Sequence, residues 1–139
     1  QGNQSSSNSS QYKSLQDALD NYGIIAKLAP TWFPDGYSLE NITVNETPAQ
    51  TTIHAIYRDR DSDEISVNVI LLLKPSTRTY EKDGSNVTVY LKNETEHYIM
   101  SNMGQTNIVW QAENCECSIS GLFTLDEAEK MVDSMYERN

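Results

Sequence analysis

Residues 106–136 read TNIVWQAENCECSISGLFTLDEAEKMVDSMY, and this stretch decides the fold of the chain. Residues 108–110 and 115–119 alternate apolar with polar side chains on either side of a polar turn, which is the pattern of a β-hairpin. The chain then reverses at Gly121, and Thr124 with Glu127 forms the capping box that begins a helix. The stretch therefore predicts a hairpin followed by a helix that needs a sheet to pack on.

The final helix is amphipathic. Its apolar stripe consists of Leu125, Ala128, Val132 and Met135, with Met131 and Tyr136 at the borders. Burying the three large members of the stripe contributes roughly 5 to 9 kcal/mol before the ordering entropy is subtracted. Because that is too much apolar surface for a free appendage, we expect the helix to pack on a floor formed by Trp110, Cys117 and Ile119.

Period-two alternation of apolar residues extends over most of residues 37–120 and predicts further short strands joined by polar turns. The predicted strands lie at 39–44, 53–57, 65–73, 87–91, 98–100, 108–110 and 115–119. The spacing from Leu39 to Ile42 indicates a bulge. The third strand is apolar on both faces from Val69 to Leu73, which predicts a central strand covered on both sides. Short connections indicate antiparallel neighbours.

The beginning of the chain divides into a polar leader and a short helix. Residues 1–11 contain only Gln, Gly, Asn and Ser, so they bury no apolar surface and are predicted to be a flexible tether. Ser14 and Asp17 mark the start of a helix that Gly23 ends or interrupts. We predict one α+β domain over residues 12–139. It is a single antiparallel sheet of about six to seven strands, with a short N-terminal helix and a C-terminal amphipathic helix on one face.

The charge balance limits the possible partners. Ten Lys and Arg residues stand against 20 Asp and Glu residues, which gives a formal net charge of −10. Such a surface repels phosphate backbones and anionic lipid headgroups, so no nucleic-acid partner is expected. No apolar run reaches the length of a membrane span. The chain starts at Gln1, and we expect membrane contact only through an N-terminal anchor outside this sequence.

Residues 30–37, PTWFPDGY, combine two prolines with three aromatic residues. Proline holds the backbone extended and the rings cover apolar area, so the segment is predicted to clamp the first helix onto the sheet. The alternative is an aromatic lip in which Trp32 and Tyr37 stack on a sugar or a peptide. Trp32 and Tyr37 are therefore the candidate ligand or partner residues.

One acidic pattern and one pair of thiols resemble parts of metal sites, but neither forms a complete site. Asp59, Asp61 and Asp63 have the spacing that opens a calcium loop, but Glu64 replaces its glycine and Ile70 its bidentate glutamate. A solvated hairpin turn is the favoured interpretation, with a weak cation site as the alternative.

Cys115 and Cys117 share one face of a strand, where alternate residues are poorly placed for a disulfide. With only His54 and His97 as further ligands, no zinc spacing results, and both thiols are predicted to be reduced core residues. A histidine acting on a nearby Ser or Cys is the remaining catalytic alternative, although no nucleophile motif accompanies it. The sequence predicts no catalytic residues, no metal and no cofactor.

Several of these segments together resemble a family of uncharacterised domains from Gram-positive bacteria, DUF4367. The resemblance covers about residues 30–136 and is carried by residues 30–37, 53–57, 97–102, 108–110, 117–121 and 125–130. It implies an extracytoplasmic domain behind a single membrane anchor, in proteins similar to anti-sigma factors, with residues 1–11 as the stalk. Cys117 departs from the family pattern, where an aromatic residue is expected, which leaves the packing under the final helix open.

Three functions follow from these observations. The first is a non-catalytic sensory or protein-interaction domain on the cell surface, whose partner is a protein or another cell-envelope component. The second is a lipoprotein-type binding module for a small apolar or glycan ligand. The third is a hydrolase that uses His97 or His54. A large apolar cavity favours the second, and a flat acidic face without a pocket favours the first.

Overall fold

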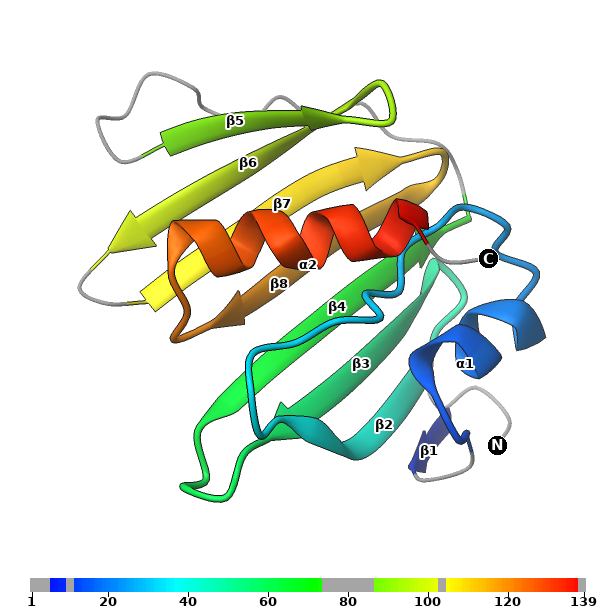
Figure 1. The fold of residues 1–139 in the computed structure, drawn as a ribbon. Helices are drawn as coiled ribbons and strands as arrows, with labels where there is room; N and C mark the ends of the chain where they lie inside the picture. The colour runs from blue at the N-terminus through cyan, green and yellow to red at the C-terminus, as the bar shows by residue number, and fades with distance from the viewer. Residues whose placement is uncertain (1–5, 10–11, 74–86, 103–104, 138–139) are drawn as a thin grey trace.

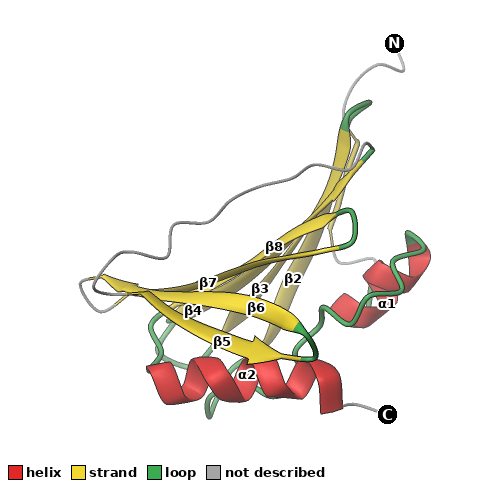
Figure 2. Ribbon diagram, turned by 90° about the horizontal axis from the view of Figure 1, so that it is seen from above, coloured by secondary structure: helices red, strands yellow, loops and turns green. Residues whose placement is uncertain are grey.

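The computed structural model describes residues 6–9, 12–73, 87–102 and 105–137, which form one sheet with two helices on the same face (Figures 1 and 2). The strands are β1 (Ser6–Ser9), β2 (Ser38–Glu46), β3 (Gln50–Arg58), β4 (Glu64–Leu72), β5 (Val87–Lys92), β6 (Thr95–Asn102), β7 (Gln105–Ala112) and β8 (Cys115–Gly121). The helices are α1 (Leu15–Asn21) and α2 (Leu125–Glu137). The predicted α+β class is confirmed.

All strand pairs are antiparallel, and the sheet order is β1-β2-β3-β4-β8-β7-β6-β5. The seven predicted strands correspond to β2 through β8. β1 adds an edge strand within the predicted tether, where Ser6–Ser9 pairs with β2. The other residues of segment 1–11 lie outside the described part of the chain, so their role as a flexible tether stays a prediction.

Two details of strand geometry follow the sequence pattern. The register of β2 against β3 shifts between Leu39 and Asn41, which confirms the predicted bulge. β4 lies between β3 and β8 in the middle of the sheet, as its apolar sequence predicts. On the face away from the helices, Ile70 and Leu72 are only half-buried, and none of the described elements packs over them.

Helix α1 begins where its capping residues predict. The Ser14 hydroxyl accepts a hydrogen bond from the Asp17 backbone N–H at 3.1 Å, and this satisfies one of the unpaired donors of the first turn. Leu15, Ala18 and Leu19 are buried against the sheet. Gly23 has a φ of +72°, a backbone conformation that other residues rarely adopt, and it ends the helix.

Helix α2 has the predicted capping box and, except for its first residue, the predicted apolar stripe. The Thr124 N–H donates to Glu127 Oε1 at 3.0 Å, and the Glu127 N–H donates to the Thr124 hydroxyl at 3.1 Å. Leu125, predicted to lie in the apolar stripe, is 42% exposed, whereas Met131 is completely buried. The prediction for Leu125 was wrong because Leu125 is the first residue of α2 and lies at the open end of the stripe, whereas Ala128, Val132 and Met135 are completely buried.

The core lies between the sheet and the two helices. Trp110, Cys117 and Ile119 are buried on the face that α2 covers, as predicted for the floor beneath the final helix. One apolar cluster extends from Leu15 in α1 to Met135 in α2. Because this cluster is continuous, the sheet and both helices share one core.

Candidate functional site

Residues 29–37, called the strap here, run alongside α2 across the face of the sheet (Figure 1). Ser134, only 7% exposed, fixes the strap to the helix. Its hydroxyl oxygen accepts hydrogen bonds from the backbone N–H groups of Thr31 at 3.0 Å and Trp32 at 3.2 Å, and it donates to the Met131 carbonyl at 2.7 Å. The Thr31 hydroxyl donates in turn to the Ser134 carbonyl at 3.1 Å.

Sequence reasoning did not identify Ser134. Its signal was present, since a serine stands among the apolar residues of the helix stripe. A buried hydroxyl needs hydrogen-bond partners, and here the partners are backbone groups of a distant segment. Such a partner cannot be identified from local sequence.

Trp32 and Tyr37, the predicted ligand residues, meet different neighbours. The Trp32 ring is half-buried beneath Lys130, whose Nζ lies 5.5 Å from the ring centroid. Beside it is a hollow of about 210 Å³, lined also by Asp133, Ser134 and Glu137. Tyr37, at the other end of the strap, is half-buried; burial raises its pKa, and the carboxylates of Asp59, Asp63 and Glu127 raise it further. A shared aromatic lip formed by these two residues stays a prediction.

His97 is completely buried, and both of its ring nitrogens have partners. Its Nδ1 lies 3.0 Å from the Tyr90 carbonyl oxygen. Since a carbonyl only accepts, Nδ1 carries the proton, and Nε2 accepts from the Tyr136 hydroxyl at 2.9 Å. Burial lowers the pKa of His97 and raises that of Tyr136 to about 12, so both groups are neutral near pH 7. His97 thus links β6 to α2.

The two cysteines are free and buried. Burial raises the pKa of Cys115 to about 11 and that of Cys117 well above its ordinary value. A thiol that stays protonated is a poor nucleophile and a poor metal ligand. Both cysteines therefore act as small core residues, as the sequence predicts.

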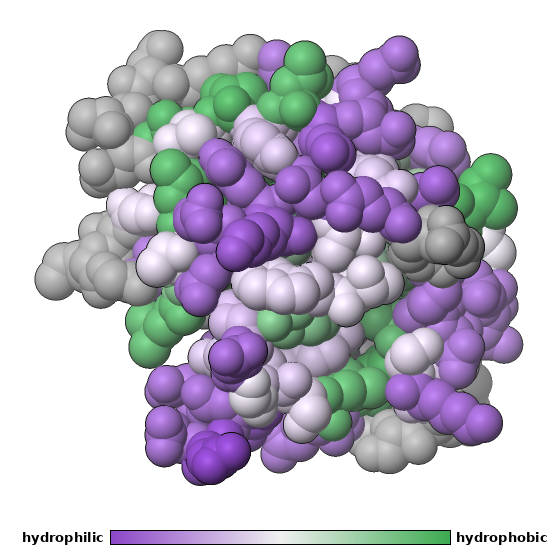
Figure 3. Space-filling view, viewed as in Figure 1, coloured by the Kyte–Doolittle hydropathy of each residue, from purple (hydrophilic) through white to green (hydrophobic). Residues whose placement is uncertain are grey.

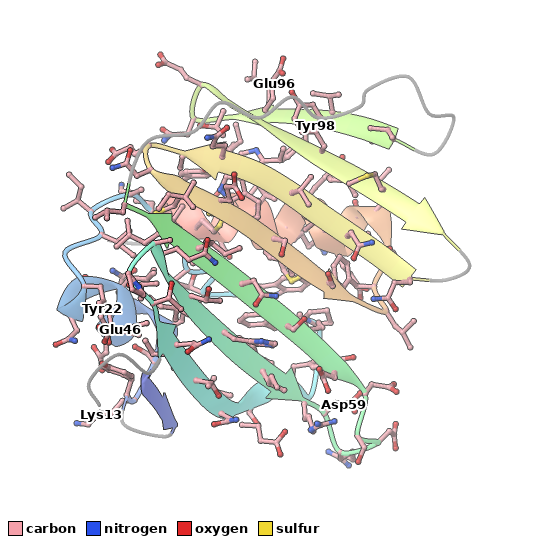
Figure 4. All side chains as sticks on the ribbon, turned by 180° about the vertical axis from the view of Figure 1, so that it is seen from behind. Lys13, Tyr22, Glu46, Asp59, Glu96 and Tyr98 are labelled. Carbon is pink, nitrogen blue, oxygen red and sulfur yellow. The ribbon has the colours of Figure 1, made fainter. Side chains whose placement is uncertain are left out.

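The Asp59 carboxylate organises the turn between β3 and β4. Its Oδ1 accepts hydrogen bonds from the backbone N–H groups of Asp61 at 3.0 Å and Asp63 at 2.9 Å. Figure 4 shows Asp59 at this end of the sheet. This arrangement supports the predicted hairpin turn over a calcium loop. Within the described ranges, no group of three or more His, Cys, Asp or Glu residues is placed to hold a metal ion.

The second face of the sheet carries neither helix (Figure 2). We call the part of this face formed by the middle strands the uncovered face; it is turned toward the viewer in Figure 4. Its side chains are half-buried and mostly uncharged. One row across neighbouring strands is formed by Thr43, His54, Asn68 and Ser118. The next row is formed by Asn41, Ile56, Ser66, Ser120 and Asn107.

The uncovered face differs from the outward surface of α2, which is strongly hydrophilic (Figure 3). The helix sequence LDEAEKMVDSMYE places five carboxylates and one lysine within 13 residues. The charge is therefore unevenly distributed along the chain: acidic side chains gather on α2, whereas the rows on the middle strands carry mainly hydroxyl, amide and imidazole groups. His54 Nε2 in this face is buried and has no hydrogen-bond partner among the described residues.

Comparison with known proteins gives one match. Residues 27–135 match the family model described as a domain of unknown function, DUF4367. No curated protein and no solved structure matches the chain. Among the described helices, none has the length and apolar character of a membrane span.

Proposed function

The chain belongs to the DUF4367 family, and on that premise we propose that it is a non-catalytic sensory or protein-interaction domain. It works outside the cytoplasmic membrane as part of a membrane-anchored regulator similar to anti-sigma factors. The extracytoplasmic location and the regulatory role rest on the family resemblance of the sequence. The observation that carries the interaction role is the uncovered face of the sheet.

The uncovered face has the chemistry that a protein partner requires. The centres of protein interfaces are depleted in charged residues, because burying an unpaired charge is costly. The two rows of the uncovered face present neutral groups such as Thr43, Asn68 and Ser118, which exchange hydrogen bonds with a partner without that cost. Because the chain has a net charge of −10, such a neutral area is where a partner protein makes contact without burying unpaired carboxylates.

Three of the four candidate reactive groups, His97, Cys115 and Cys117, support a role without catalysis. A general base needs an accessible nitrogen within reach of its substrate. His97 uses both nitrogens for contacts within the fold, and the thiols of Cys115 and Cys117 are buried and protonated. These three side chains therefore serve the fold, His97 through its hydrogen bonds and the two cysteines as buried core residues.

Cross-linking in cells tests the interaction role. A photo-reactive amino acid at Asn68 lies on the uncovered face, and the same amino acid at Lys130 lies on the outward surface of α2. We expect a specific cross-linked band from position 68 and none from position 130. Equal labelling from both positions, or none from position 68, contradicts the assignment of the uncovered face.

The location has a separate test. Asp61→Cys places one thiol on the exposed turn, while the native cysteines are buried and do not react. A membrane-impermeant maleimide is expected to label this variant in intact cells. Labelling that requires cell lysis contradicts the extracytoplasmic location. The parent chain, carrying only its native cysteines, is the control.

The binding-module function is favoured by an observation of its own. A hollow of about 320 Å³ between α1, the strap and the sheet has mainly apolar walls. Its size falls at the lower end of the range for small-molecule sites. This hollow is independent of the uncovered face, since the two lie on opposite faces of the sheet.

A further inference from the structure

Three elements enclose the hollow beside α1. Residues 13–16 form its rim at the start of the helix, the strap forms one wall, and Leu39 of β2 with Tyr57 of β3 forms the base. The hollow lies on the face of the sheet that carries the helices, where apolar residues reach the surface between α1 and α2 (Figure 3). It is therefore separate from the uncovered face.

The walls of the hollow are apolar and largely preformed. The apolar lining is formed by Leu15, Ala29, Pro30, Phe33, Leu39 and Tyr57. The Phe33 and Tyr57 rings stack with centroids 4.0 Å apart. The strap wall is held by the two hydrogen bonds from Thr31 and Trp32 to Ser134. A wall that is already fixed lowers the ordering cost of binding.

Most polar groups at the rim are already engaged. The Ser14 hydroxyl caps α1, the Gln16 Nε2 donates to Asp20 at 2.8 Å, and the Thr31 hydroxyl donates to the Ser134 carbonyl. The Gln16 Oε1 is buried and has no hydrogen-bond partner among the described residues. Lys13 differs from these three, because it is exposed and no ion pair joins it to another residue of the described part of the chain. Lys13 is the charged residue among those that line the hollow, so one cationic side chain stands at the edge of mainly apolar walls.

We propose that this hollow binds a small amphiphile with a compact apolar body and one carboxylate. The apolar body, an aromatic ring or a short branched chain, lies against Phe33 and Tyr57, and the carboxylate pairs with the Lys13 ammonium. The charge of the lining selects this ligand over a cationic one, since Lys13 is the charged residue among those that line the hollow. The inference goes beyond the proposed partner binding and does not depend on it.

Matched probes separate the two parts of this ligand. Phenylacetate carries the ring and the carboxylate, phenethyl alcohol keeps the ring with a neutral head, and acetate is the head alone. Titrations of the whole chain are followed by amide chemical shifts. We expect saturable shifts at Leu15, Phe33, Leu39 and Tyr57 with phenylacetate, weaker binding at the same residues with phenethyl alcohol, and no saturation with acetate.

Two charge variants test the head group. Lys13→Gln is expected to weaken phenylacetate binding by about two- to fivefold, the range of an exposed ion pair, and to leave phenethyl alcohol binding unchanged. Lys27→Gln removes an equal charge from an exposed position outside this hollow and is expected to change neither affinity. Equal weakening in both variants means that overall charge, not Lys13, attracts the anion, and it overturns the proposal.

Leu39→Trp tests the apolar body by filling the hollow. We expect it to abolish saturable binding of both aromatic probes, while circular dichroism retains the parent spectrum. Unchanged binding in a folded Leu39→Trp variant, or no saturable shifts in the parent chain, overturns the proposal. If Leu39→Trp does not fold, the Lys13→Gln variant tests the proposal instead. Lys13 is exposed, so its replacement is expected to leave the fold intact.

Discussion

The Ser134 hydroxyl accepts a hydrogen bond from the Thr31 backbone N–H at 3.0 Å, although 103 positions separate the two residues in the chain. The same oxygen also accepts from Trp32. One buried side chain in α2 thus fixes the strap, and the strap forms a wall of the hollow beside α1. The last helix of the chain therefore shapes a surface built mainly from its first forty residues.

Ser134→Ala leaves two backbone N–H groups of the strap without their acceptor. An unsatisfied buried donor costs about 1–3 kcal/mol, so we expect a fall in the free energy of unfolding of that size in urea denaturation. Ser120→Ala on the uncovered face is the matched control and is expected to change stability by less. Similar losses in the two variants contradict the role of Ser134.

His97 makes stability depend on pH. Burial lowers its pKa in the folded chain below the ordinary value of 6.5, so the unfolded chain binds a proton more readily. Stability is therefore lost as pH falls through the pKa of the unfolded chain. We expect the free energy of unfolding to decrease more between about pH 7.5 and about pH 5.5 in the parent than in His97→Gln. An equal decrease in both proteins argues against this assignment.

Gly121 lies where β8 closely approaches β4. A Cβ at this position would lie 2.8 Å from Ile65 Cγ1 and 3.0 Å from the Glu64 carbonyl oxygen. Since the second contact is with backbone, a small rotamer change does not relieve it. We expect Gly121→Ala to cost about 1–3 kcal/mol in denaturant unfolding, whereas Ser118→Ala in the same strand costs less. A neutral Gly121→Ala variant would falsify this close packing.

Val132→Asp places a carboxylate in the completely buried part of α2. An unpaired buried charge is among the most destabilising changes, and we expect the domain to unfold at room temperature, as measured by circular dichroism. Leu125→Asp is the matched control. Because Leu125 is 42% exposed and lies in the first helical turn, where an acid interacts well with the helix dipole, we expect it to retain the fold. Comparable melting temperatures for the two variants contradict the difference in burial between Val132 and Leu125.

The features that the sequence predicts correctly are local. Alternation located the strands from β2 to β8, the spacing from Leu39 to Ile42 revealed the bulge, and Thr124 with Glu127 marked the start of α2. Each of these depends on residues that are near neighbours in the chain. The free, buried cysteines followed from strand geometry in the same way.

The features that the sequence did not predict depend on distant residues. How far the sheet covers α2 decides which apolar residues of the helix are buried, and it leaves Leu125 exposed while it buries Met131. The partners of Ser134 lie at the other end of the chain. β1 has a polar sequence without alternation and is seen only through its pairing with β2. The hollow beside α1 likewise needs three separate segments to be brought together.

The position of β8 governs the order in which the chain can fold. β8 is the last of the described strands, yet it pairs with β4 in the middle of the sheet and joins β2–β4 to β5–β7. Until residues 115–121 are available, β4 retains an unpaired edge. Contacts of such long sequence separation slow folding, because the loop between them must close first. A nascent chain that stops before β8 therefore exposes a strand edge prone to association, and the sheet is completed only after residues 115–121 have been made.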